Sequence, residues 1–422
     1  DDPPCGCDAC DRKAAQLRSL ELAAAAVGGS LPIIDEVRAE LARHSRRAAL
    51  GRRRRWPADA DALRARVAAQ SEGRLWLNYD PDLFLPSPFD AFLLSGGCDR
   101  PVWTTSWGAA VPHGPSEVDI CYIVGCGRSG TTALAEVLGH HSAILFLNEP
   151  RELWIPDVPS FDVWSVKAEE RQGKLVCTEA DLGAGDAAKT ICASYRSLAS
   201  LLHQQLGART AREEADASPC NRVVVLEKFP EHAFRMPLLS AVCGSGGLRC
   251  RFLHLVRNGV DVARSIARFG AAGSWYGAKG EWKWRQVMAV LHAEQAKLED
   301  SLRLGPSFLQ FLDEGAGAPA RLFARGLVEW ALSVRFARRS ASSTDFVEVR
   351  YEDLVASPDA VLAAVESLLG FGRSGALRDA VAATFRQPSA APPLPAKQAE
   401  VLAAVRGSFV DVLLGEWNGE RA

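Results

Sequence analysis

Several features that mark whole classes of protein are missing from this sequence. No apolar run approaches the ~20 residues that a membrane-spanning helix needs, so we predict no membrane span in this chain. There is no N-x-S/T sequon, so nothing in the sequence calls for N-glycosylation. The formal net charge of -2 excludes a generally basic nucleic-acid-binding protein, although it leaves room for a local basic patch around an anionic ligand.

A disulfide framework is also missing. The 11 cysteines are an odd number and most lie scattered through apolar segments, so we predict buried thiols. Cys5, Cys7 and Cys10 in PPCGCDAC are close enough to share a metal ion but supply only three thiolates, with no obvious fourth ligand nearby. We expect a flexible tail with accessible thiols there, and a zinc site is the alternative.

Composition divides the chain into three parts. Residues 1–72 are rich in Ala, Leu, Arg and Glu behind the cysteine-containing tail and predict a helical appendage, whose basic run 52–55 we interpret as a solvated face. Residues 73–117 hold many Pro, Gly, Trp and Phe residues and predict an irregular lead-in to a main domain of residues 118–422. The first residue is Asp1 rather than Met, which we interpret as a trimmed chain or a fragment, from which a targeting segment could already have been removed.

From residue 118 onward, apolar strands alternate with helical stretches. The runs DICYIV, NRVVVLEK, CRFLHLV and DFVEVR are short and apolar or β-branched, and each leads to a helix-like segment or a turn. This alternation predicts an α/β fold with a parallel sheet flanked by helices. Because such sheets bind ligands at the carboxyl ends of their strands, the residues directly after these runs are the candidates for chemistry.

The segment GCGRSGTT, residues 125–132, follows the first of these runs and has the composition of an anion-binding loop. Small residues let the backbone turn so that several N–H groups face one anion at the start of a helix. A Walker A loop would place Lys and then Ser or Thr after the second glycine, whereas Gly130 is followed by Thr131 and Thr132 and the cation is Arg128. A nucleotide kinase or other P-loop NTPase is therefore an alternative, but this loop lacks the lysine that such an enzyme needs. A purely structural strand-to-helix turn is a second alternative.

This loop resembles the 5′-phosphosulfate loop of sulfotransferases that use 3′-phosphoadenosine 5′-phosphosulfate (PAPS), a family with a P-loop-like fold that needs no Lys-Ser/Thr pair and no metal. The resemblance implies that the nucleotide is held by Gly127, Arg128, Ser129, Gly130, Thr131 and Thr132.

Three later segments extend the resemblance, which covers roughly residues 118–370. FLHLVRNGVDVARSIARF, residues 252–269, is similar to the family's 3′-phosphate segment, with Arg257 at a strand end and Ser265 eight residues later. An arginine leaving a strand and a serine in the following helix can converge on one phosphate. VEVRYEDLVASPDAVLAAVESLLG, residues 347–370, resembles a late strand-turn-helix segment in which the tyrosine at the position of Tyr351 lies near the nucleotide. GLVEWALSVRFARR resembles the preceding helix in the bacterial and tyrosylprotein branches.

Two segments compete to supply the catalytic base. Cytosolic sulfotransferases place a histidine two residues after a lysine, but in LEKFPEHAF the residue two positions after Lys228 is Pro230. His232 is displaced by two residues, and we interpret it as surface or structural. Glu149 follows the strand-like run AILFL and stands 21 residues after Arg128, where tyrosylprotein sulfotransferases carry their catalytic glutamate. Glu149 is therefore the predicted base.

Residues around Glu149 leave its role and the branch open. Arg151 matches an arginine that helps to hold substrate in the tyrosylprotein branch, but it could also simply pair with Glu149 as a strand-end ion pair. The pair Glu149-Pro150 with Trp154 equally resembles the Golgi carbohydrate branch, so we predict Arg151 and Trp154 as substrate residues.

The resemblance implies sulfuryl transfer from PAPS to a hydroxyl acceptor by in-line displacement, with Arg128 and Lys228 as the fixed cations. We expect carbohydrate ahead of peptidyl tyrosine as acceptor, and the Golgi lumen ahead of the cytoplasm. A non-catalytic relative that binds the nucleotide or a glycan is a further alternative. Lys397 could reach the nucleotide from the C-terminal part. An aromatic and basic segment could either contact the acceptor or form an ordinary amphipathic helix and its cap; it comprises Trp275, Tyr276, Lys279, Trp282, Lys283, Trp284 and Arg285.

Overall fold

The computed structural model describes most of the predicted main domain. The described residues are 117–139, 141, 143–155, 157–161, 163, 173–183, 186–196, 198–200, 222–270, 275–276, 281–313, 315, 317–341, 345–385 and 393–418. They all belong to the second of two units of the chain, Arg100–Ala422. The predicted appendage, nearly all of the lead-in and the three cysteines Cys5, Cys7 and Cys10 lie outside the described residues.

A parallel sheet forms the centre of this unit. Its five strands are β1 (Glu117–Val124), β2 (Ile144–Asn148), β3 (Arg222–Lys228), β4 (Arg249–Val256) and β5 (Phe346–Arg350). Their order is β2-β3-β1-β4-β5, and all four pairings are parallel. The predicted α/β fold is confirmed, and its strands coincide with the apolar runs of the sequence.

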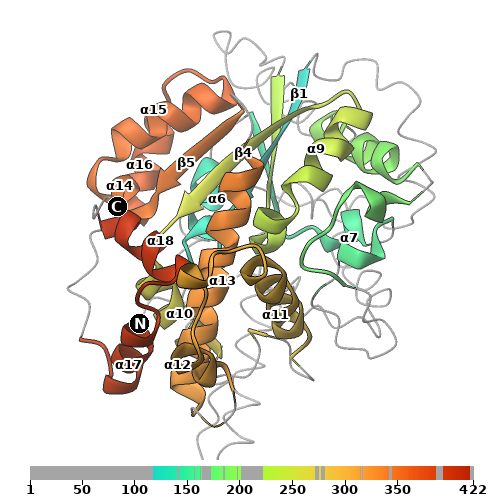
Figure 1. Cartoon of the computed structure of the whole chain (residues 1–422). Coiled ribbons are helices and arrows are strands. Elements are labelled where there is room, and N and C mark those ends of the chain that lie inside the picture. The colour runs from blue at the N-terminus through green and yellow to red at the C-terminus, as the bar shows by residue number, and fades with distance from the viewer. Residues whose placement is uncertain are drawn as a thin grey trace, which may run out of the picture. The chain divides into compact units, whose positions relative to one another are not determined.

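Helices cover both faces of the sheet, which explains why its inner strands are largely apolar (Figure 1). The helices α6 (Thr131–Leu138), α14 (Tyr351–Ala356), α15 (Pro358–Leu369) and α16 (Gly375–Thr384) share one hydrophobic core with the strands. On the other face lie α9 (Met236–Ser245) and the short 3-10 helix Pro230–Phe234. The last six residues of both β1 and β4 are buried.

The longest helix, α13 (Ala318–Ser340), packs against α10 (Gly259–Gly270). A Cβ added to Gly326 of α13 would lie 2.9 Å from the Cα of Ala263 in α10, so this glycine lets the two backbones approach. The remaining helices are α7 (Arg151–Trp154), α11 (Trp282–Gln295), α12 (Pro306–Leu309), α17 (Ala396–Ala404) and α18 (Phe409–Asn418). Short 3-10 helices span Pro159–Phe161, Glu179–Leu182, Asp300–Leu302 and Gln310–Leu312.

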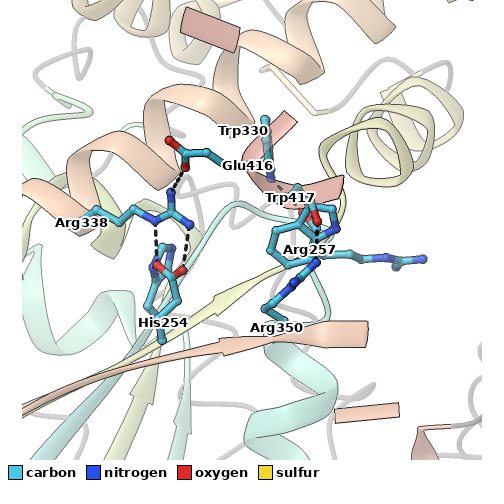
Figure 2. A network of polar contacts seen from close by, with 8 residues as sticks. His254, Arg257, Trp330, Arg338, Arg350, Glu416 and Trp417 are labelled. Carbon is cyan, nitrogen blue, oxygen red and sulfur yellow. Dashed lines mark hydrogen bonds and ion pairs between the residues drawn. The ribbon is translucent and has the colours of Figure 1, made fainter. Parts of the chain in front are cut away.

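A polar network fastens α18 to the edge strand β5 (Figure 2). Arg338 of α13 donates to Glu348 of β5 at 2.8 and 2.9 Å and to Glu416 of α18 at 2.8 Å. Arg350 donates to the carbonyl oxygen of Trp417 at 2.6 Å, and its guanidinium lies 4.1 Å from the centroid of that indole. The C-terminal helix is thereby held beside the strand that leads to Tyr351.

No helix among the described residues is long and apolar enough to cross a bilayer.

Candidate active site

The sheet brings five separately predicted segments to one edge, because the carboxyl ends of parallel strands point the same way. The glycine-rich loop follows β1, Glu149 follows β2, Lys228 ends β3, Arg257 follows β4 and Tyr351 follows β5. Strand β1 lies between β3 and β4, so its loop has the lysine on one side and the arginine on the other.

The loop after β1 needs glycine for two physical reasons. Gly125 and Gly130 have φ angles of 148° and 97°, which favour residues without a Cβ. A Cβ added to Gly130 would also come within 3.0 Å of the Tyr351 ring, so the tyrosine lies directly against the loop. Inside the loop, the Ser129 N–H donates to the Cys126 carbonyl at 3.2 Å. The chain then enters α6 with no side chain capping its first turn, which leaves N–H groups at the helix N-terminus for a ligand.

An orphaned hydroxyl in this loop fits an anionic ligand. Ser129 is only 1% exposed, and its Oγ has no hydrogen-bond partner. Thr131, at the start of α6, is also buried. Buried hydroxyl groups nearly always find a partner, and a phosphate or sulfuryl oxygen against the α6 N-terminus would provide one. The residues present therefore fit the 5′-phosphosulfate end of PAPS.

Arg128 connects the two nucleotide segments that the sequence predicted separately. Its Nε donates to the Ser265 Oγ in α10 at 3.2 Å, across 137 residues of sequence. Its backbone has a φ of 71°, in the left-handed region that non-glycine residues rarely adopt. The glycine-rich loop after β1 and the segment after β4 thus meet at this side chain.

Arg257 is positioned by its stack on Tyr351 and by the turn after β4. Its guanidinium carbon lies 4.5 Å from the centroid of the Tyr351 ring, and its Nη2 lies 4.0 Å from Asp261. Its Nε is buried without a hydrogen-bond partner, so a donor is left for an acceptor such as a phosphate. The Trp330 indole donates to the Arg257 carbonyl at 3.0 Å, which fixes the start of α10 (Figure 2).

Glu149 and Lys228 form a direct ion pair at the ends of neighbouring strands. The Lys228 Nζ lies 2.7 Å from the Glu149 Oε1, and the Glu149 N–H donates to the Lys228 carbonyl at 2.9 Å. Lys228 is 3% exposed and Glu149 18% exposed at the side chain, so the carboxylate is the partner closer to solvent. The sequence offered Arg151 as the partner of Glu149; the side chain of Arg151 lies outside the described part of the structure.

Backbone strain marks these positions independently. Only Arg128, Glu149 and Glu281 among the described non-glycine residues have a positive φ, and two of them are predicted catalytic residues. Such conformations cost about 1 to 3 kcal/mol and cluster at functional sites.

Sequence reasoning missed a buried carboxylate, that of Glu227, the residue before Lys228 in β3. Glu227 is fully buried and accepts hydrogen bonds from the Trp154 indole and the Tyr195 hydroxyl, both at 2.7 Å. The His232 Nε2 lies 2.9 Å from the same carboxylate. The missed signal was an acidic residue inside the apolar run VVVLEK, which requires buried partners.

This network corrects the expectation for Trp154 and decides between the two interpretations of His232. Trp154 is fully buried against Glu227, so its indole has no surface to offer an acceptor directly. His232 is likewise unexposed, and burial lowers its pKa despite the neighbouring Glu227. Of the two interpretations of His232, surface or structural, the structure shows the structural one.

The aromatic and basic segment contributes mainly to the core. Trp275, Tyr276, Lys283 and Trp284 are buried, as expected for an amphipathic helix and its cap, while Trp282 donates to the Gly173 carbonyl at 2.9 Å and Arg285 is exposed. Lys279 lies outside the described residues. Lys397 forms an exposed ion pair with Glu400 in α17 at 2.8 Å. No group of three His, Cys, Asp or Glu residues within the described ranges is arranged to hold a metal ion.

Comparison with known proteins identifies the class of this domain. Residues 121–307 match the model of a family described as "Sulfotransferase family". The matched span includes the glycine-rich loop, Glu149, Lys228, Arg257 and Ser265. Residues 121–307 therefore form a domain of the sulfotransferase family, an enzyme class that generally uses PAPS as the sulfuryl donor. This match decides against the nucleotide-kinase alternative.

Three solved structures are similar to the chain at low identity. A sulfotransferase from Mycobacterium tuberculosis is 16% identical with a TM-score of 0.38, and the match covers 83% of this chain and 93% of that one. A sulfotransferase from Alicyclobacillus acidocaldarius is 17% identical with a TM-score of 0.36, covering 72% and 96%. The sulfotransferase domain from the curacin biosynthetic pathway is 16% identical with a TM-score of 0.31, covering 72% and 92%. No curated protein matches the chain.

Proposed function

We propose that this sulfotransferase transfers the sulfuryl group of PAPS to a hydroxyl acceptor by in-line displacement, with Glu149 as the general base. The observation that carries the proposal is the Lys228–Glu149 pair of 2.7 Å at the sheet edge that also carries the anion loop. A cation for the leaving group and a base for the acceptor are thereby held next to each other.

PAPS supplies a sulfuryl group joined to a nucleotide phosphate that leaves readily. Its 5′ end would be held by the loop residues Gly127–Thr132, where Ser129 has an unpaired buried hydroxyl. Its 3′-phosphate would be held by Arg257 and Ser265, with Tyr351 supporting the arginine through the 4.5 Å stack. Neither contact requires a metal ion, since the positive charges of Arg128, Lys228 and Arg257 converge on one edge.

The chemistry of the step falls to three side chains. The Glu149 carboxylate accepts the proton of the acceptor hydroxyl while the hydroxyl oxygen attacks sulfur. Lys228 would donate to the bridging oxygen on which negative charge grows, and Arg128 would stabilise the sulfuryl oxygens. Because Lys228 is 3% exposed, water screens its charge poorly, which strengthens its effect on the departing oxygen.

The proposed acceptor is a carbohydrate ahead of a tyrosine-containing polypeptide, and the proposed compartment is the Golgi lumen ahead of the cytoplasm. The pair Glu149-Pro150 supports the carbohydrate assignment. Trp154 was expected to support this assignment as a sugar contact, but its indole is buried and gives no such support.

Two experiments test this function. Adenosine 3′,5′-bisphosphate should raise the unfolding temperature of the full chain without magnesium, whereas ATP should raise it much less. Incubation with sulfur-labelled PAPS and a panel of glycans, simple phenols and tyrosine peptides should then label a hydroxyl-bearing acceptor. A larger thermal shift with ATP and magnesium than with the bisphosphate would overturn the assignment of the nucleotide site.

A further inference from the structure

An indole lies against the glycine-rich loop from the side of α11 and α13. A Cβ added to Gly127 would come within 2.6 Å of the Trp275 Cζ2, and even closer to its Cη2. Pro230, two residues after Lys228, is the next neighbour at 3.5 Å. The benzene edge of Trp275 therefore occupies the space in which any side chain at residue 127 would lie.

Buried charges hold this indole in place. The Trp275 Nε1 donates to the Glu329 Oε2 of α13 at 2.8 Å, so the ring cannot rotate without breaking a buried hydrogen bond. The Lys283 ammonium lies 2.8 Å from the other oxygen of Glu329 and 4.5 Å from the Trp275 ring centroid. Lys283 also lies 3.2 Å from Glu231.

The charge cluster is sealed from solvent. Lys283, Glu231 and Glu329 are at most 3% exposed, and Trp275 is 7% exposed. Burial alone would lower the pKa of Lys283, but Glu329 and Glu231 raise it, so the lysine stays charged. Trp275 brings this cluster beside the loop at Gly127, and burial raises the pKa of the neighbouring Cys126 thiol, which Glu329 raises further.

We propose that Trp275 is a positioning residue for the 5′-phosphate cradle, because its indole, fixed by Glu329 and Lys283, sets the place of Gly127. This inference rests on the proposed function, in which the loop holds the 5′ end of PAPS. Displacing the loop backbone by a fraction of an ångström would misalign the N–H groups that would face the anion, while the backbone of Arg257 and Ser265, in the segment after β4, would stay in place.

The test compares two nucleotides that differ only at the 5′ position. Isothermal titration of the full chain measures affinity for adenosine 3′,5′-bisphosphate and for adenosine 3′-monophosphate. Trp275→Phe removes the benzene edge that touches Gly127 and the donor to Glu329. We expect it to lower the affinity for the bisphosphate roughly tenfold to a hundredfold, the equivalent of one lost charge-assisted hydrogen bond. The affinity for the monophosphate should stay within a factor of about two of the wild-type value.

Trp282→Phe is the matched control, since Trp282 lies in the same segment and donates to a backbone carbonyl, that of Gly173. It should leave both affinities unchanged. If the role of Trp275 is purely structural, Trp275→Phe will lower the affinities for both nucleotides together or for neither, and either result overturns the proposal. If the wild-type chain itself shows no preference for the bisphosphate, the proposed function fails, and this inference fails with it.

A double-mutant cycle gives a second measurement that does not depend on Trp275→Phe alone. Gly127→Ala adds a methyl group where the indole lies, so it should weaken the bisphosphate at least tenfold. Combined with Trp275→Phe, which vacates that space, the alanine should cost measurably less than it does alone. Full bisphosphate affinity in Gly127→Ala would show that the indole does not set the loop and would overturn the proposal.

Discussion

Glu149→Gln is the substitution that isolates proton transfer from binding. Glutamine keeps the shape of the side chain, and its amide oxygen can still accept from Lys228, 2.7 Å from the present carboxylate. It cannot take up the acceptor's proton. Loss of general-base catalysis should lower kcat by roughly 10² to 10⁴, or about 3 to 5 kcal/mol of transition-state stabilisation.

The same substitution should leave the nucleotide site intact at a small cost in stability. Lys228 is 3% exposed and loses its anionic partner, but a neutral acceptor stays within reach. We therefore expect a loss of about 1 to 3 kcal/mol in the free energy of unfolding, less than for removal of one partner from a fully buried pair. Affinity for adenosine 3′,5′-bisphosphate should stay within a few-fold, because this carboxylate repels the phosphates and does not hold them.

The chain offers a closely matched control for this experiment. Glu281 also has a left-handed backbone, with a φ of 48° against 49° for Glu149, and also pairs with a cation at 2.7 Å, the guanidinium of Arg325. Glu281→Gln should keep wild-type turnover of labelled PAPS with the acceptor found in the panel. Our reasoning is refuted if Glu149→Gln, like the control Glu281→Gln, keeps more than about a tenth of the wild-type kcat.

Three further predictions concern the binding of the nucleotide 3′-phosphate, the role of the buried His232 and the stability of the fold at acidic pH. Arg257→Ala should lower bisphosphate affinity by about 1.5 to 3 kcal/mol and spare adenosine 5′-monophosphate; equal losses for both in calorimetry would place the 3′-phosphate elsewhere. His232→Ala should lower the free energy of unfolding by about 2 to 4 kcal/mol, because it empties a buried site and removes a partner of Glu227, yet keep kcat per folded molecule; a folded but inactive variant would make the histidine the base. Burial alone would raise the pKa of Glu348, but hydrogen bonds from His254 and an arginine hold it at about 2. Its stabilisation is thus complete above its ordinary pKa of 4.5 and disappears as pH falls toward 2, so Glu348→Gln should flatten the acid side of a melting-temperature profile.

The strands and the loop could be predicted because their physics is local. A parallel strand covered on both faces is mostly apolar on both, so β1, β3 and β4 appear in the sequence as largely apolar runs. A backbone that turns onto an anion at a helix start needs glycine, which made residues 125–130 visible. Both signals lie within a few consecutive residues.

The partnership of Glu149 with Lys228 could not be predicted in this way. The two residues are 79 positions apart, and their contact depends on strand order, in which β2 pairs with β3 and not with β1. The register of that pair sets Asn148 beside Lys228, so Glu149 emerges next to the lysine. Local sequence instead offered Arg151, two residues away. The pairing of β2 with β3 makes Lys228 the partner of Glu149, and spacing along the chain could not have identified it.

Buried polar residues were missed for a related reason. Glu227 and Glu329 occur in a predicted strand and a predicted helix, where each could equally have faced solvent. What fixes them inside is the set of donors that fold onto them: Trp154, Tyr195 and His232 for the first, and Trp275 and Lys283 for the second. Because each donor comes from a different element or loop, only the assembled sheet and helices reveal the network.

Glu149, the proposed base, and Lys228, the proposed cation for the leaving group, are therefore positioned as one unit. Lys228 holds Glu149 twice, through its backbone carbonyl and through its ammonium group, and this double contact maintains a left-handed glutamate that would otherwise relax. Glu227, the preceding residue, anchors the same strand end into the core through three buried donors. A change at Glu227 should consequently act on the proposed catalysis through Lys228 and Glu149 together, although its own carboxylate is fully buried.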